Sequence, residues 1–325
     1  MIPPSPFLPL ALALLCDAAA GDPDWMYRRV PHPVVLMGRA IAALDRAWNR
    51  PEHGDARRLF LGATATFVVL CGSGAIGMAL HAVLERLTAG WIVEAVLMSV
   101  LIAQRGLYRH VRDVADALHT GGLAAGRQAV ARIVGRSTES LDEAGVSRGA
   151  IESLAENFSD GVVAPVFWAA LFGLPGILAY KALNTADSMI GHRNRKYLHF
   201  GRVAARLDDA ANFVPARLSG ILIAAAASFL TRLSGWAALR TMLTDGRTHR
   251  SVNAGYPEAA MAGALGIRLS GPRAYDGETA EEPWIGAGRD AAPDDIGIAL
   301  GVFVRACLLL FALVAAGAFI WPLPA

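Results

Sequence analysis

Lysine is nearly absent from this sequence, and its scarcity draws attention to two positions. Of the 30 basic residues in the 325-residue chain, only Lys181 and Lys196 are lysine. A chain so biased towards arginine has little reason to use lysine unless a compact ammonium group is needed. Lys181 stands beside a polar motif described below, and we therefore interpret it as a candidate functional residue.

Cysteine is also scarce, and several catalytic signatures are missing. Cys16, Cys71 and Cys307 lie in apolar runs and form neither a CxxC pair nor a Cys/His zinc pattern, so we expect buried free thiols. The sequence contains no GxxxxGK[ST], no GxSxG and no HExxH, so any ATP would be bound by other means than a P-loop. With a net charge of +2 and interspersed charges, nothing indicates a nucleic-acid-binding face.

Apolar residues, in contrast, are abundant. They make up 54% of the chain, and the mean hydropathy is +0.39, which indicates a membrane protein. A helix needs about 20 residues to cross a bilayer, so the second and last apolar runs are predicted as spans. The first run lacks the basic flank of a signal peptide and is expected to be retained. The runs are about Leu8–Ala20, Leu59–Leu84, Trp91–Ala103, Val162–Tyr180, Leu218–Leu233 and Gly297–Trp321.

These patterns predict an all-α, multi-pass integral membrane protein with roughly 4–6 membrane segments. We expect one membrane-embedded catalytic domain over 1–325, with cytoplasmic helical and loop insertions at about 104–160 and 240–295. The first insertion has a helical pattern, for which Ser147 is the predicted N-cap. The second is rich in glycine and proline, which is typical of a lid-like loop.

The apolar run 162–180 is interrupted by Gly173-Leu-Pro175-Gly176, a sequence that ends or kinks a helix. Both flanks of this run are rich in arginine, as cytoplasmic segments are. A single straight span would place these flanks on opposite sides of the membrane. We therefore hypothesise a re-entrant hairpin at 162–180 that leaves both flanks on the cytoplasmic side.

Three acidic residues precede this run at a helical spacing. Glu152, Glu156 and Asp160 occupy positions i, i+4 and i+8, so a continuous helix would stack them on one face. Like charges at this spacing repel each other, which favours a cation or a basic partner against them. Carboxylates are ligands for Mg²⁺, and the three are candidate metal ligands. The alternative is a solvated helix face.

A second polar group follows the run. The pattern Asn184-x-x-Asp187 places an amide beside a carboxylate, which suits a metal-bound phosphate. Lys181 and Arg193 could hold phosphate oxygens, and on a helix Lys181 and His192 share one row. Arg206 and Asp208 follow, and Asp208 shares a helix face with Asn212. The alternative is an ordinary polar helix end.

Two further groups are weaker. His32 stands between two prolines in a stiff turn, and for this residue alone a rigid loop is the better interpretation. Asn253 and Glu258 flank Ala-Gly-Tyr-Pro, which predicts a turn that presents an amide and a carboxylate. Together, the groups at the ends of apolar runs indicate a site for phosphate and metal at a membrane surface.

Long motifs in this chain resemble the cobinamide-phosphate synthase family of cobalamin biosynthesis (CobD/CbiB). The resemblance follows the chain in order over nearly its whole length. It rests on GDP…PHPV (Gly21–Val34), ARIVGRSTESLDEAGVSRGAIESLAENFSDGVVAPVFW (Ala131–Trp168), YKALNTADSMIGHR (Tyr180–Arg193), ARLDDAANFVPARLSG (Ala205–Gly220) and SVNAGYPEAAMAGALGIRLSGP (Ser251–Pro272).

The resemblance implies an enzyme of the cell (inner) membrane that joins adenosylcobyric acid to aminopropanol or its O-phosphate through an amide bond. It further implies ATP and Mg²⁺, contact with the lipid bilayer, and association with other membrane enzymes of the late cobalamin pathway. Within it, Lys181, His192, Asp187 and His32 are candidate catalytic residues. Arg193, Arg206, Asn184, Asn253 and Glu258 are candidate cofactor-binding residues, and the candidate Mg²⁺ ligands are Glu152, Glu156, Asp160, Asp187 and Asp208.

Two other function classes fit part of the pattern. Asn-x-x-Asp on membrane helices is also typical of the Mg²⁺–diphosphate sites of membrane prenyltransferases, although those sites carry denser aspartate repeats. A transporter would line a path with polar groups inside the membrane. Here the charges cluster at the ends of the apolar runs, and only Glu94 and Arg305 lie in the middle of one, either as part of a buried pair or with the side chain reaching the interface.

Overall fold

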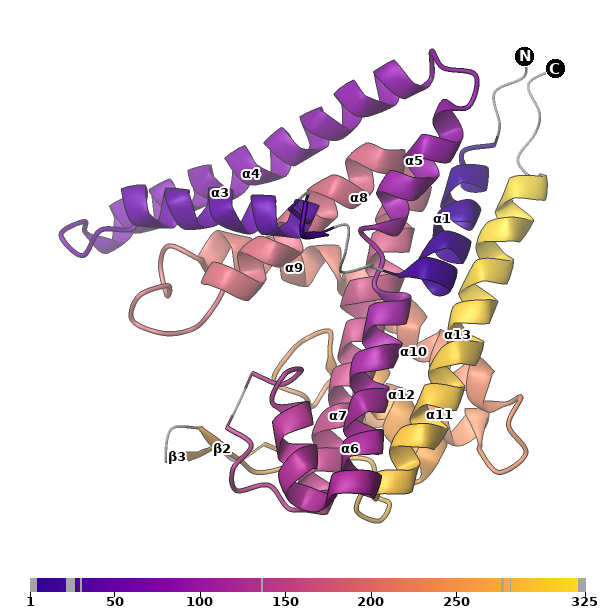
Figure 1. The fold of residues 1–325 in the computed structure, drawn as a ribbon. Coiled ribbons are helices and arrows are strands. Elements are labelled where there is room, and N and C mark those ends of the chain that lie inside the picture. Colours follow the sequence, from indigo (N-terminus) through magenta and orange to yellow (C-terminus); the bar gives the residue numbers. More distant parts are fainter. Residues whose placement is uncertain are drawn as a thin grey trace. The chain divides into compact units, whose positions relative to one another are not determined.

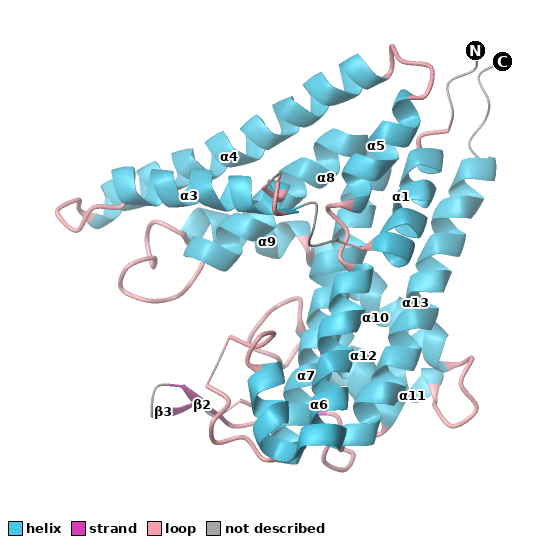
Figure 2. Ribbon diagram, viewed as in Figure 1, coloured by secondary structure: helices cyan, strands magenta, loops and turns pink. Residues whose placement is uncertain are grey.

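Helices dominate the computed structural model, and its strands are only two or three residues long (Figure 2). The predicted all-α class is therefore confirmed. Asp22 and Pro23 of the first sequence motif lie outside the described residues. The structure describes residues 5–21, 27–29, 31–135, 137–275, 278–280 and 282–320. The elements are α1 (Phe7–Ala20), α3 (Pro33–Trp48), α4 (Asp55–Leu84), α5 (Gly90–Ser99), α6 (Gln104–Val130), α7 (Glu143–Phe158), the π-helical turn η1 (Ser159–Val163), α8 (Ala164–Ile190), α9 (Arg202–Ala211), α10 (Phe213–Ala227), α11 (Gly235–Asp245), α12 (Gly255–Leu265), β1 (Leu269–Ser270), β2 (Arg273–Tyr275), β3 (Glu278–Ala280), β4 (Trp284–Ile285) and α13 (Pro293–Ile320).

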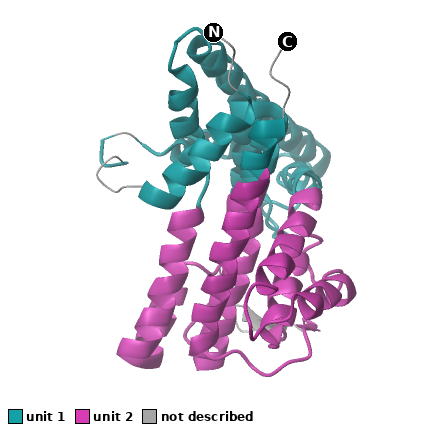
Figure 3. Ribbon diagram, turned by 90° about the vertical axis from the view of Figure 1, so that its right-hand side faces the viewer, with its two compact units in different colours: residues 1–103, 164–212, 314–325 teal, residues 104–163, 213–313 magenta. Residues whose placement is uncertain are grey.

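The chain forms two compact units, each built from segments that are distant in sequence (Figure 3). Unit 1 contains residues 1–103, 164–212 and 314–325, and unit 2 contains residues 104–163 and 213–313. Both predicted polar insertions belong to unit 2. The single catalytic domain expected over the whole chain stays a prediction.

Several helices are suited to crossing a membrane. Among the described residues, four helical runs are long and apolar enough, and a fifth results if α9 and α10 together form one span. This number agrees with the predicted range, and the two spans predicted from length alone correspond to α4 and α13. The first apolar run forms α1, whose 14 residues extend only about 21 Å. The four runs are Asp55–Leu84, Gly90–Val130, Glu143–Ile190 and Pro293–Ile320.

In unit 1, α4 packs along α8, and α9 contacts both helices. The backbones of α4 and α8 approach closely at Gly77, where an added Cβ atom would lie 2.6 Å from the Cα atom of Pro175. Small residues allow such close helix contacts in membrane proteins. This packing holds the polar end of α8 beside α9, where the candidate site is built.

The predicted break in the run 162–180 is present. Gly173 interrupts α8 with φ 62° and ψ −150°, a conformation that favours glycine. Both parts of α8 reach the end of α9: Trp168 Nε1 donates to the Ala211 carbonyl (3.2 Å), and the Tyr180 hydroxyl donates to Asn212 Oδ1 (2.8 Å). The helix is therefore interrupted at Gly173, where the chain changes direction. Figure 1 shows α8, which contains this break, beside α9. The placement of both flanks on one side of a membrane stays a prediction.

In unit 2, α7 packs against α6 and α12. The predicted N-cap at Ser147 is wrong, because α7 begins at Glu143 and Asp142 Oδ1 accepts a hydrogen bond from Gly145 N (2.7 Å). Ser147 is instead buried inside the helix. Aspartate and serine are comparable N-caps, so the choice between them depends on the loop that precedes the helix.

The acidic stack predicted for Glu152, Glu156 and Asp160 is also not formed as expected. Glu152 and Glu156 lie on α7, where Glu152 is buried and Glu156 is exposed. Asp160 belongs to η1, whose wider turn changes the angular spacing of the residues that follow. The three carboxylates therefore do not share one environment.

The lid-like loop predicted at 240–295 is largely structured. It contains the end of α11, all of α12, and two short antiparallel strand pairs, β1 with β4 and β2 with β3. Most of α12 is buried, because its run of alanine, glycine and methionine packs against α7, α10 and α11. Asn253 lies in a turn, as predicted, but Glu258 lies in the first turn of a buried helix, so the predicted turn is present only in its first part.

Candidate functional site

Two acidic and two amide side chains come together in unit 1 between α8 and α9. We call Asn184, Asp187, Asp208 and Asn212 the acid–amide cluster. Asp208 is buried and accepts hydrogen bonds from Asn212 Nδ2 (2.9 Å) and Asn184 Nδ2 (3.4 Å). The shared face predicted for Asp208 and Asn212 is therefore confirmed, and Asn184 joins them from α8.

Asp187 supplies the second carboxylate of the cluster. It is half-buried and lies close enough to Asp208 to interact with it electrostatically. Gly191 packs directly on it, since an added Cβ atom would lie 1.9 Å from Asp187 Oδ1. Two neighbouring carboxylates in a partly buried place repel each other. Both stay ionised only if a cation lies beside them; otherwise one of them takes up a proton.

A cavity of about 410 Å³ lies beside the cluster, at the connection from α8 to α9. Asp209 is its only lining acid among the described residues. Its basic lining side chains are His192, Arg193, His199, Arg202 and Arg206. Arginine holds phosphate through paired N–H donors, so this cavity suits a phosphorylated ligand.

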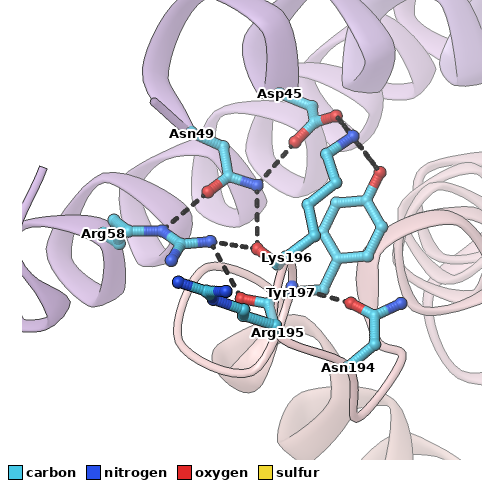
Figure 4. A network of polar contacts seen from close by, with 7 residues as sticks. All are labelled: Asp45, Asn49, Arg58, Asn194, Arg195, Lys196 and Tyr197. Carbon is cyan, nitrogen blue, oxygen red and sulfur yellow. Dashed lines mark hydrogen bonds and ion pairs between the residues drawn. The ribbon is translucent and has the colours of Figure 1, made fainter. Parts of the chain in front are cut away.

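The α8–α9 connection is fixed to α3 and α4 by a polar network (Figure 4). Lys196 Nζ forms an ion pair with Asp45 Oδ2 (2.8 Å), and the Tyr197 hydroxyl donates to the same oxygen (3.2 Å). Hydrogen bonds to Asp45 and Tyr197 raise the pKa of Lys196. Asn49 Nδ2 donates to the Lys196 carbonyl (3.2 Å), and Arg58 donates to the same carbonyl. This network positions the loop that carries Arg193.

The remaining candidates of unit 1 differ in their suitability. His32 caps α3: its Nδ1 accepts from Val34 N (3.1 Å), and its Nε2 lies 3.1 Å from the Val100 carbonyl. Both ring nitrogens therefore have backbone partners, which favours the structural interpretation of His32. Lys181 lies on α8 one turn before the acid–amide cluster. His192 follows the end of α8 and lines the basic cavity, so the predicted helical row from Lys181 does not reach it.

Unit 2 contains a separate buried polar group. Glu152 Oε1 accepts a hydrogen bond from Ser270 N (2.6 Å), and Ser270 Oγ lies 3.5 Å from Glu282 Oε2. Ser270 has φ 61°, which is unusual for a residue with a side chain. Glu152 therefore supports this backbone conformation, and one of its oxygens is already engaged.

Asn253 and Glu258 have protein partners in unit 2. Arg217 Nη1 donates to Asn253 Oδ1 (3.1 Å), and His249 Nε2 lies 3.9 Å from Glu258 Oε2. Glu258 is buried. These contacts tie the start of α12 to neighbouring segments.

The five candidate metal ligands are thus divided between the units. Asp187 and Asp208 belong to unit 1, whereas Glu152, Glu156 and Asp160 belong to unit 2. Within the described part of the chain, no three His, Cys, Asp or Glu side chains form a group that could hold a metal by themselves. A Mg²⁺ ion in a phosphate site needs only one or two carboxylates, so the acid–amide cluster remains a suitable candidate.

Several site residues were not identified from the sequence. Arg202 and His199 line the basic cavity, and Tyr180 orients Asn212. Arg202 lies four residues before Arg206, so a helical projection would have found it. His199 and Tyr180 carry no comparable signal.

Comparisons with known proteins identify the family. The family described as CobD/Cbib protein matches residues 10–303. A cobalamin biosynthesis protein CobD from Sinorhizobium fredii is 53% identical over 310 residues, 94% of this chain and 95% of its own length. The CobD proteins of Rhizobium meliloti and Rhodobacter capsulatus are 52% and 45% identical, covering 94% and 96% of this chain and 95% and 97% of their own lengths.

No solved structure matches the chain. The resemblance drawn from the sequence motifs is confirmed by the family match and by these relatives. The family match extends from α1 into α13, so it includes the acid–amide cluster, the basic cavity and the buried group of unit 2. The chain belongs to the CobD/CbiB family.

Proposed function

We propose that this protein forms an amide bond between a propionate carboxyl of adenosylcobyric acid and the amine of aminopropanol or its O-phosphate, at the expense of ATP. The product is adenosylcobinamide or its phosphate. Family membership indicates a role in cobalamin biosynthesis and suggests an enzyme. The apolar helices suggest a membrane protein, and the proposal places it in the inner membrane.

The observation that carries the proposal is the basic cavity beside the acid–amide cluster in unit 1. A carboxylate is a poor acyl donor and is activated most simply as an acyl phosphate. That route requires cations around the transferred phosphoryl group and an oxygen-rich place for Mg²⁺. The two neighbouring groups of side chains provide both.

The cluster fits Mg²⁺ by the chemistry of its donors. Asp187 and Asp208 offer carboxylate oxygens, Asn184 and Asn212 offer amide groups, and no sulfur lies among them. Asp187 and Asp208 would hold the ion. When bound, Mg²⁺ would neutralise charge on the phosphate oxygens of ATP.

The remaining roles follow from position. Arg193, Arg202 and Arg206 would hold phosphate oxygens inside the basic cavity. His192 lines the same cavity and would accept a proton from the attacking amine. His32 is less suited to that role, because both of its ring nitrogens have backbone partners. Lys181, one turn before the cluster on α8, would supply a further positive charge.

The candidates of unit 2 are assigned a supporting role. Glu152 holds the backbone of Ser270, and Asn253 and Glu258 contact Arg217 and His249. We propose that they shape a substrate-binding segment. Glu156 and Asp160 remain candidate Mg²⁺ contacts.

The proposal is tested by supplying membranes that contain the protein with adenosylcobyric acid, ATP, Mg²⁺ and aminopropanol phosphate. The expected result is the amide product, detected by mass, with none formed when ATP is omitted. The assay is repeated with free aminopropanol to compare the two amines. Solute uptake into sealed vesicles without this product would favour a transporter, and transfer of a prenyl group from its diphosphate would favour a prenyltransferase.

A further inference from the structure

A second cavity lies wholly within unit 2, between α6 and α13. Its volume is about 490 Å³, and the activity proposed above does not use it. Tyr108, Arg112, Asp116 and His119 line it from α6, and Asp294 and Arg305 line it from α13. Small and apolar residues of α13 form the wall between Asp294 and Arg305.

Arg305 is unusual because it lies inside the most apolar of the candidate spans. Glu94, the other charged residue in the middle of an apolar run, has His81 Nδ1 3.1 Å from its Oε1 atom. Within the described residues, Arg305 makes one hydrogen bond, from its Nη1 to the Gly301 carbonyl of its own helix (3.0 Å). No carboxylate of the described residues lies within ion-pair distance of it. A charged arginine in a membrane segment is costly unless a counter-charge or water reaches it.

The charges are unevenly distributed along the cavity. At one end of the cavity, His119 Nε2 lies 3.0 Å from Asp294 Oδ1, so α6 and α13 are in contact there. Arg305 lies eleven residues further along α13 (305 − 294), or about 16 Å, and Tyr108 lies eleven residues back along α6 (119 − 108). Tyr108 and Arg305 therefore share the far end, away from the two aspartates.

Arg112 lies between these two ends. Its Nε atom is 3.5 Å from Asp116 Oδ2, an ion pair between two exposed side chains and therefore a weak one. An arginine has five N–H donors, so Arg112 can contact a ligand while it keeps this pair. From its middle to its far end, the cavity thus combines two guanidinium groups and a phenol, a set of side chains that matches a phosphate group.

We propose that the cavity between α6 and α13 binds a phosphate-bearing ligand, held by Arg112 and Arg305 with Tyr108 beside them. The ligand supplies the counter-charge that Arg305 lacks in its own apolar helix. Two sources share this chemistry: the headgroup of an anionic lipid and a soluble phosphate or phosphate monoester. The proposal goes beyond the amide-forming reaction and is independent of it.

The test uses the full-length protein purified in detergent, with binding measured by native mass spectrometry and by calorimetry. Phosphatidylglycerol is compared with diacylglycerol of the same acyl chains, which lacks the phosphate. Inorganic phosphate and aminoethyl phosphate are titrated separately. Binding of phosphatidylglycerol alone identifies a lipid site, and binding of the soluble phosphates identifies a metabolite site.

Arg305→Gln and Arg112→Gln should each raise the dissociation constant of the phosphate ligand by about tenfold or more, because each loses a charge-assisted hydrogen bond. Arg109→Gln is the matched control, because Arg109 is exposed on α6 but does not line the cavity; its binding should stay within about twofold of the original. If Arg305→Gln does not fold, Arg112→Gln at an exposed position carries the comparison. The proposal is overturned if no phosphate ligand binds the unmodified protein, or if the variants at the cavity bind it as tightly as the control does.

Discussion

Asn212 Nδ2 donates a hydrogen bond of 2.9 Å to Asp208 Oδ2, one helical turn away at the end of α9. The Tyr180 hydroxyl donates to Asn212 Oδ1 at 2.8 Å, which orients the amide so that its NH₂ group faces the carboxylate. Asp208 is therefore held in place by an amide that is itself held in place by α8. A buried carboxylate so positioned, with Asp187 nearby, is suited to bind a cation.

Asp208→Asn should reduce amide formation by about a hundredfold or more, because it removes the negative charge and keeps the size of the side chain. The protein should still accumulate in membranes, since Asn212 and Asn184 can pair with the new amide after a rotation of the side chain. The rate is measured by mass spectrometry of the corrinoid product at saturating ATP. Asp113→Asn, at an exposed position on α6, is the control and should change the rate by less than about twofold. Near-normal turnover of Asp208→Asn would remove this residue from the site.

Gly191→Ala should disturb Asp187 directly. The new Cβ atom would meet Asp187 Oδ1 at 1.9 Å and the Asp187 carbonyl oxygen at 2.7 Å, so the carboxylate has to move. We expect the Mg²⁺ concentration for half-maximal activity to rise by about tenfold, with a stability loss of about 1–3 kcal/mol. Gly72→Ala on α4 is the control, because its Cβ atom would meet nothing within 4 Å. Equal Mg²⁺ dependence in the two variants would contradict the role of Asp187.

Much of this architecture is visible in the sequence. Apolar length alone predicted α4 and α13 as spans, and Gly173 with Pro175 predicted the break in α8. The pairing of Asp208 with Asn212 followed from their i, i+4 spacing, which a regular helix satisfies without tertiary information. These features are local, and local rules were sufficient to find them.

The errors arose where tertiary packing overrides local pattern. The wider turn of η1 moved Asp160 out of register with Glu152 and Glu156. The segment from Asn253 to Glu258 was predicted as a turn because it begins with Asn-Ala-Gly, yet burial against α7, α10 and α11 makes its second part a helix. The division of the candidate acids between two units depends on long-range contacts that no spacing rule contains.

The ion pair between Lys196 and Asp45 should stabilise unit 1 only slightly, because the Lys196 side chain is 58% exposed. In a double-mutant cycle with Lys196→Met and Asp45→Asn, we expect a coupling energy of about 0.5–1 kcal/mol in thermal unfolding. Hydrogen bonds to Asp45 and Tyr197 raise the pKa of Lys196 above its ordinary value of 10.5. Because the pKa of Lys196 is higher in the folded than in the unfolded protein, the ion pair contributes its full stability below pH 10.5 and loses it only as the pH rises past the folded pKa. The coupling energy should therefore stay constant between about pH 7 and 9. A coupling that disappears within that interval would show that another group controls the contact.

The interruption of α8 at Gly173 leads to a prediction about membrane topology. If the run 162–180 enters and leaves the membrane on one face, Asn157 before it and Ser188 after it should be accessible from the same side. Both residues are exposed, so Asn157→Cys and Ser188→Cys can each be labelled in a background where Cys16, Cys71 and Cys307 are serine. With sealed inverted vesicles, a membrane-impermeant maleimide should modify both positions, and with intact spheroplasts it should modify neither. Labelling of the two positions from opposite sides would establish a straight crossing, and Asp160 and Asp187 could not then face one cytoplasmic pool of ATP.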